Sequence, residues 1–151
     1  MNRSFFSKNA VRMIVLGLFV MVSGCIGVNQ PTDDQIQSQS QNYFNQEYQG
    51  LFLAEEVVKK NGYKKNDTSY VAEVTVMGRA QLSLEDFAKL TMSDPEVSGM
   101  EKMANTLKIG MMTMTLPAFE AGDVLEFERE YLFIKTDNGW QIKEQLNASA
   151  H

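Results

Sequence analysis

The segment from residue 124 to residue 146, VLEFEREYLFIKTDNGWQIKEQL, constrains the fold of this chain more than any other stretch. Both flanks are rich in β-branched and aromatic residues, which is typical of β-strands. Between them, the Asp-Asn-Gly turn at 137–139 favours a tight reversal, because Asn and Gly adopt positive φ at little cost. We therefore expect an antiparallel hairpin of strands 124–136 and 140–146.

The middle of the chain predicts two more strands and two short helices. Residues 69–82 alternate between two sets of side chains with period two, which indicates a long strand, with a bulge at Gly78. The SLED sequence at 83–86 has the pattern of a capping box and predicts a helix to about residue 91. Asp94-Pro95 suits the start of another helix. KIGMMTMTL at 108–116 reads as a further strand.

An apolar stripe at spacings of three, four and seven predicts a long helix before these elements. Pro31-Thr32-Asp33 supplies a start and Asn61-Gly62 a stop, so we expect a helix over about 32–61, bent at Gly50. The stripe consists of Ile36, Tyr43, Phe44, Tyr48, Leu51, Phe52 and Val58.

The order of these elements predicts an α+β fold, with a long N-terminal helix packed on a curved, mainly antiparallel four-stranded sheet. Together with the closing hairpin FIKTDNGWQI, it resembles the NTF2-like and cystatin-like superfamily over most of residues 32–146. The resemblance implies a cone-shaped fold with a pocket between helix and sheet. It also implies that a homodimer is common and catalysis rare.

The N-terminus carries the pattern of an export signal. Three basic residues and no acid precede the apolar run at 13–22, which is shorter than the about 20 residues that span a bilayer. The sequence VSGC at 22–25 resembles the bacterial lipobox. The resemblance implies cleavage between Gly24 and Cys25 and a diacylglyceryl thioether on Cys25, and Ile26 after it implies outer-membrane sorting. A retained membrane helix, a free thiol or an interchain disulfide are the alternatives for Cys25.

These patterns divide the chain into four parts. We expect a signal peptide at 1–24, a lipidated N-terminus and polar tether at 25–35, a single α+β domain at 36–147 and a frayed tail at 148–151. The signal peptide would remove three of the 14 basic residues and none of the 19 acidic ones, which leaves a net charge of −8. An acidic domain argues against binding to nucleic acid.

Catalytic and zinc-binding residue sets are missing from the sequence. The one histidine is His151, at the C-terminal end, and the one cysteine is Cys25, so neither a nucleophile–histidine pair nor a set of zinc ligands is available. Glu126, Glu128 and Glu130 share one strand face, which is typical of a solvated surface. We therefore expect a protein that is not an enzyme and needs no cofactor.

Two groups of residues are candidates for binding. Arg129 shares its strand face with aromatic residues and could line a helix–sheet pocket for an anionic ligand, or simply pair with an acid at the rim. The pocket candidates are Phe127, Arg129, Tyr131 and Trp140. Thioethers bind Cu(I), but methionine is also an adaptable core filler and a common residue of binding surfaces. The metal candidates are Met100, Met103, Met111, Met112 and Met114.

The sequence thus favours a lipid-anchored protein of the outer membrane that faces the periplasm and serves a protein partner or a homodimer as an accessory module. Apolar residues on both faces of the sheet support this interpretation, because one face would need cover beyond the helices. Those on the second face include Val71, Met77, Leu132 and Ile134. A carrier of a small anionic or apolar ligand, and a Cu(I)-handling protein, are the alternatives.

Overall fold

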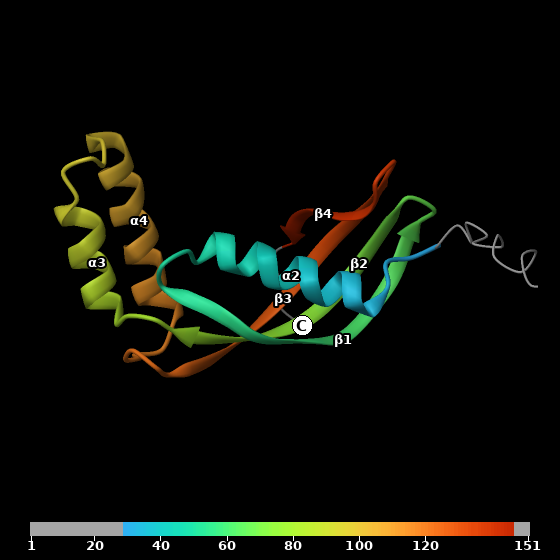
Figure 1. The fold of residues 1–151 in the computed structure, drawn as a ribbon, viewed down its shortest axis with the longest axis horizontal. Helices are drawn as coiled ribbons and strands as arrows, with labels where there is room; N and C mark the ends of the chain where they lie inside the picture. The colour runs from blue at the N-terminus through green and yellow to red at the C-terminus, as the bar shows by residue number, and fades with distance from the viewer. Residues whose placement is uncertain (1–28, 147–151) are drawn as a thin grey trace, which may run out of the picture.

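The computed structural model describes residues 29–146, and in this range the chain is α+β, with three helices and one open antiparallel sheet (Figure 1). The strands form a meander in the order β1-β2-β3-β4, so β1 and β4 are the edges. The elements are α2 (Asp33–Glu47), β1 (Phe52–Asn66), β2 (Ser69–Ala80), α3 (Leu84–Ser93), α4 (Gly99–Thr115), β3 (Val124–Thr136) and β4 (Gly139–Leu146). The predicted signal peptide, its cleavage site and the lipidated Cys25 lie outside the described residues.

Helix α2 begins where expected but is much shorter than predicted. Thr32 and Gln35 form a reciprocal capping box at its start. The predicted end near residue 61 is wrong, because the helix ends at Glu47 and Gly50, at φ +81°, reverses the chain. Its buried face consists of Ile36, Ser40 and Phe44, one residue per turn, followed by the cap residue Tyr48.

Strand β1 occupies the second half of the predicted helix. Its register against β2 shifts between Ala54 and Glu56 and again between Lys59 and Asn61. Such bulges interrupt the alternation of buried and exposed residues. The buried positions Phe52, Ala54 and Val57 are therefore spaced by two and then three, a pattern that is as compatible with a helix as with a strand. The bulge predicted at Gly78 of β2 lies instead on this opposite strand.

Helix α4 replaces the strand predicted over 108–116. It starts at Gly99, later than Asp94-Pro95 suggested, with a capping box between Ser98 and Glu101, and continues to Thr115. The sheet has four strands as predicted, but β1, and not residues 108–116, completes it. The remaining predicted elements are confirmed: β2, α3 with Ser83 as its N-cap, and the β3–β4 hairpin with Gly139 at φ +98°.

The core lies between α2 and one face of the sheet. The Phe44 ring of α2 packs edge-to-face on Phe127 of β3, with 4.9 Å between their centroids. Gly78 of β2 permits this approach, since a Cβ there would stand 2.9 Å from atoms of both rings. The core side chains on β2 and β3 belong to the alternate positions that face α2, and they include Ala72, Val74, Val76, Tyr131 and Phe133.

Amide side chains of α2 bind the backbone of both edge strands. Gln39 Nε2 donates to the carbonyl of Trp140 at 2.6 Å, and Gln39 Oε1 accepts from the backbone N–H of Ile142 at 2.9 Å, both on β4. On β1, Asn45 Oδ1 accepts from the N–H of Ala54 and Gln41 Nε2 donates to its carbonyl. The Gln-rich sequence of α2 therefore satisfies backbone groups at two strands that carry bulges.

On the sheet face away from α2, the apolar side chains of the two central strands are largely buried. Val71 and Leu132 lie there as predicted, paired across β2 and β3, and are only 1% and 8% exposed. They stand in a cross-strand row between Tyr63 of β1 and Glu144 of β4. Because these two side chains are already buried, they do not require a partner. The larger exposed apolar surface lies elsewhere, on the α3–α4 hairpin.

Candidate functional site

The residues proposed to line a helix–sheet pocket belong to the core. Phe127, Tyr131 and Trp140 are each at most 3% exposed and pack in the cluster between α2 and the sheet. Tyr131 also contacts the Tyr43 ring edge-on, with 5.2 Å between centroids. The three side chains therefore serve packing in this structure, and Arg129 is the one charged member of the predicted set.

Arg129 links β3 to the C-terminal end of α2. Its Nη2 donates to the hydroxyl of Tyr48 at 2.6 Å and its Nη1 to the carbonyl of Glu128 at 2.9 Å. The guanidinium carbon stands 5.2 Å from the Phe127 ring centroid, within the range of a cation–π contact. These contacts engage two of its nitrogens and its planar group, which is typical of a structural arginine.

Glu47 closes the same corner of the fold. Burial raises the pKa of its carboxyl above the ordinary value, and the positive charges of Arg129 and Lys108 oppose that shift without reversing it. Lys108 of α4 donates from Nζ to the backbone carbonyl of Glu47, at the C-terminal end of α2. A cation at this end of a helix is favourable because the last carbonyls lack partners in the helix. This contact ties α4 to the end of α2.

The α3–α4 hairpin stands at one end of the sheet, and α2 begins at the other end, beside the turn between β1 and β2 (Figure 1). In α4, Met112 is the one buried side chain. The opposite side of α4 carries five apolar side chains that are each more than half exposed. We call this set the methionine face: Met100, Met103, Leu107, Met111 and Met114, exposed by 84%, 77%, 67%, 55% and 88%.

The five candidate metal ligands therefore do not come together. The expectation that Met112 and Met114 share a strand face is wrong, because both lie on a helix and point to opposite sides of it. Met100 and Met103 do share a helix face, as predicted. Since a helix rises 1.5 Å per residue, Met100 and Met114 are about 21 Å apart along α4. One ion cannot reach both ends of that row.

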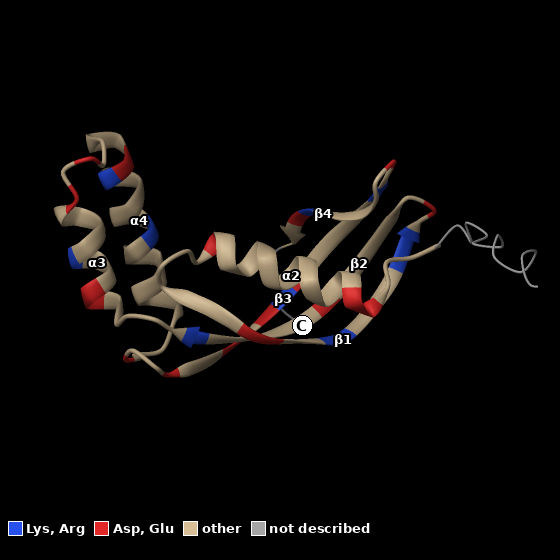
Figure 2. Cartoon of the chain, viewed as in Figure 1, with Lys and Arg blue, Asp and Glu red and all other residues tan. Residues whose placement is uncertain are grey.

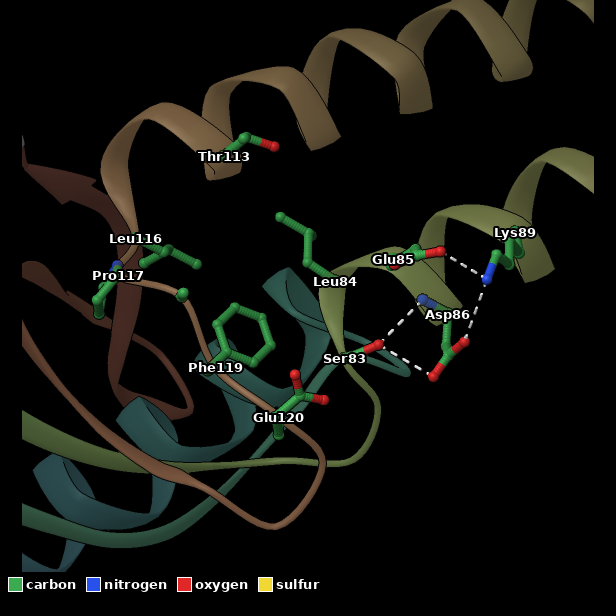
Figure 3. Close-up of a pocket in the computed structure, with 11 residues that line it drawn as sticks. Ser83, Leu84, Glu85, Asp86, Lys89, Thr113, Leu116, Pro117, Phe119 and Glu120 are labelled. Carbon is green, nitrogen blue, oxygen red and sulfur yellow. Dashed lines mark hydrogen bonds and ion pairs between the residues drawn. The ribbon is translucent and has the colours of Figure 1, made fainter.

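A hollow of about 440 Å³ lies at the base of the hairpin, between the start of α3 and the segment after α4 (Figure 3). Its polar groups bind one another. Ser83 Oγ accepts from the N–H of Asp86 and donates to its carboxylate, and Lys89 pairs with Glu85 at 2.7 Å. These are ordinary contacts of a helix N-terminus. The remaining polar side chains of the hollow, Thr113 and Glu120, do not bind this group, and no described contact joins them into a site.

A second, apolar groove of about 510 Å³ runs along the methionine face, lined by Met100, Met103, Ala104, Thr106 and Leu107. Figure 2 marks charged residues on both ends of the domain, and the basic ones on β1 lie toward the β1–β2 turn, at the end where α2 starts. These are Lys59, which binds Asp33 at 2.7 Å, and the exposed Lys60, Lys64 and Lys65. These lysines and the methionine face thus lie toward opposite ends of the domain.

Comparison of the chain with protein families, with curated proteins and with solved structures finds no match. None of the helices within residues 29–146 is long and apolar enough to cross a membrane. The function of the domain is therefore inferred from its geometry. The feature that sequence reasoning missed is the methionine face, because the strand reading of 108–116 split its members. The Ser98–Glu101 capping box was the available signal that α4 begins there.

Proposed function

We propose that this protein is a non-enzymatic, lipid-anchored protein of the cell envelope that binds a protein partner through the methionine face. The observation that carries the proposal is the row of five exposed apolar side chains on α4. Soluble domains seldom expose contiguous apolar patches of this kind unless they bind something. Methionine is frequent on such surfaces because its flexible thioether adapts to different partners.

The anchor in this proposal is the thioether on Cys25, in the outer membrane and on its periplasmic side. The six residue-to-residue steps from Cys25 to Pro31 span at most about 20 Å, which keeps the start of α2 close to the lipid. The methionine face, at the opposite end, would then point away from the membrane toward a periplasmic partner (Figure 1).

The finer fold assignment is part of the same proposal. A helix lying across a four-stranded antiparallel meander, with a helical insertion between its second and third strands, supports a cystatin-like or NTF2-like relationship. In that superfamily the frame commonly serves binding rather than catalysis. The assignment agrees with an accessory role for this protein.

Two experiments test the proposal in cells that express the full chain. For the anchor, Cys25→Ala should abolish labelling with a fatty-acid analogue and move the protein from the membrane to the soluble fraction. Unchanged labelling would remove the anchor from the proposal. For the partner, a photo-crosslinking residue at Met103 should give discrete adducts, whereas one at the exposed Lys89 of α3 should not. Equal or absent adducts at the two positions would contradict the interaction role.

A further inference from the structure

The residues of the methionine face are arranged symmetrically about the middle of α4. Its centre is Leu107, which is 67% exposed. Methionines lie four residues before and after it, at 103 and 111, and seven residues before and after it, at 100 and 114. Two small residues, Ala104 and Gly110, lie three residues to either side. Steps of three, four and seven fall on one face of a helix, so the symmetry is a property of the surface.

Such a surface fits a second copy of itself. Two identical helices related by a two-fold axis run antiparallel when the axis is perpendicular to both, and each residue then faces the one at equal distance on the other side of the centre. We propose that α4 pairs with α4 of a second copy in this antiparallel way, with the axis beside Leu107. The pairing places Met100 opposite Met114 of the second copy and Met103 opposite Met111.

The small residues allow the two helices to approach. Ala104 stands opposite Gly110 of the second copy in this arrangement, one such pair on each side of the centre. A Cβ built on Gly110 meets no atom within 4 Å in this chain, so the space above it is open to a neighbouring helix. The methionine side chains on either side are unbranched and can interdigitate across the gap.

The charges of the domain also favour this face. The net charge of the chain is −5 and becomes more negative when the basic N-terminal segment is removed, so most pairs of surfaces on two copies repel. The methionine face carries no ionisable side chain. Two of the three charged residues of α4 are engaged within their own chain, Glu101 at the N-cap of α4 and Lys108 at the end of α2. Pairing through α4 therefore brings uncharged surfaces together.

Pairing through a single helix from each copy makes a small interface and therefore predicts a weak dimer. Weak, specific complexes bury less than about 600 Å² per partner, whereas permanent dimers bury far more. The pair would thus depend on concentration, and an anchor in a shared membrane raises the effective concentration of the two copies. In this respect the inference rests on the proposed function, because both use the methionine face and the lipid anchor.

Disulfide trapping tests the pairing in the full chain, in the native membrane. Cys25 is the one natural cysteine and is expected to be acylated, so an introduced cysteine has no competitor. Because a disulfide needs Cα atoms within about 7 Å, Leu107→Cys should give a covalent dimer on non-reducing gels. Thr113→Cys is the matched control: it is exposed on the same helix but lies off the methionine face, and it should remain monomeric.

A second pair of variants fixes the direction of the helices. Met100→Cys alone and Met114→Cys alone should not form dimers, because about 21 Å separates each from its own equivalent in an antiparallel pair. Coexpression of the two, with tags of different size, should give the mixed dimer. A monomeric Leu107→Cys variant, or a dimer of Met100→Cys alone, would overturn the proposal. If the pairing is overturned but the photo-crosslinking residue at Met103 still forms adducts with another protein, the proposed function stands. If such adducts are absent as well, the pairing and the proposed function are both wrong.

Discussion

Arg129 in β3 donates a hydrogen bond from Nη2 to the hydroxyl of Tyr48 at the end of α2, with 2.6 Å between the two atoms. The guanidinium also stands over the Tyr48 and Phe127 rings. This contact joins the end of the helix to β3. A charged group in such a place is expensive unless its donors are satisfied. The two bonds of Arg129 satisfy Nη1 and Nη2, whereas Nε is buried without a hydrogen-bond partner.

The first prediction concerns this bond. Tyr48→Phe keeps the ring but removes the acceptor, so a guanidinium N–H loses its partner, and we expect the free energy of unfolding to fall by about 1–3 kcal/mol. Urea unfolding followed by Trp140 fluorescence measures it, since Trp140 is the one tryptophan and is 3% exposed. Tyr63→Phe is the control on an exposed ring and should change stability by less than about 0.5 kcal/mol. Equal effects would contradict the role of the bond.

The second prediction concerns the amide contacts at the β4 edge. Gln39→Ala removes two hydrogen bonds to the backbone of Trp140 and Ile142, and should cost about 1–3 kcal/mol in total. Amide exchange should accelerate at Ile142, because its N–H loses the acceptor. Gln37→Ala, at an exposed position of the same helix, should leave both stability and exchange nearly unchanged. Unchanged exchange at Ile142 in the first variant would argue against the contact.

The third prediction compares two glycines with opposite expected signs. Gly78→Ala places a Cβ 2.9 Å from the Phe44 and Phe127 rings and should destabilise the fold by about 1–3 kcal/mol. Gly110→Ala lies within α4, where a Cβ meets nothing within 4 Å, and should stabilise it by up to about 1 kcal/mol through helix propensity. Thermal unfolding of the two variants checks both signs. Destabilisation by Gly110→Ala would contradict an exposed helical position.

The structure explains which elements could be read from the sequence. The strands 69–80 and 124–136 were readable because they are rich in β-branched and aromatic residues and pair with each other without a register shift. Helix α3 was readable because Ser83 caps it locally. Strand β1 was not readable, since its bulges break the alternation and Phe52 and Val58 extend the helical stripe of α2 by coincidence. Residues 111–116 alternate Met and Thr in part, as a strand would. They are the end of α4, which runs without a break from Gly99 to Thr115, with Leu116 as its C-cap.

The candidate site was less predictable than the fold. Whether a methionine is buried depends on which helix face meets the rest of the domain, and that contact is long-range in sequence: Met112 is buried and Met111 and Met114 are exposed. The same holds for the glutamines of α2. Their amide contacts with β4 join residues about one hundred positions apart, so the Gln-rich composition alone could not reveal them.

The fourth prediction is a pH dependence that originates at Glu47. Burial raises its folded-state pKa above the ordinary 4.5, so the unfolded chain loses this proton at lower pH than the folded chain. Stability attributable to Glu47 therefore falls as the pH rises from about the ordinary pKa through the folded pKa, and the loss is complete above it. Glu47→Gln removes this titration, so the difference in unfolding free energy, variant minus wild type, should grow with pH and then level off.

Unfolding of both proteins across acid to neutral pH measures that difference. Glu126→Gln on the outer sheet face makes the same change in net charge at an exposed position and serves as the control. If the difference for Glu47→Gln stays flat or shrinks as the pH rises, the attraction of Arg129 and Lys108 matches or outweighs burial, and the pKa of Glu47 is not raised by folding.

The fifth prediction uses the exposure of the methionines directly. Hydrogen peroxide oxidises accessible thioethers to sulfoxides, so Met100, Met103 and Met114, at 77–88% exposed, should react well before Met112, at 6%. Peptide mass spectrometry over a time course gives the order, and the urea-unfolded chain, in which all should react alike, is the reference. Equal rates at Met112 and Met114 in the folded protein would contradict the helical assignment of this segment. Because a sulfoxide is polar, oxidation of the three exposed residues should also weaken any contact made by the methionine face.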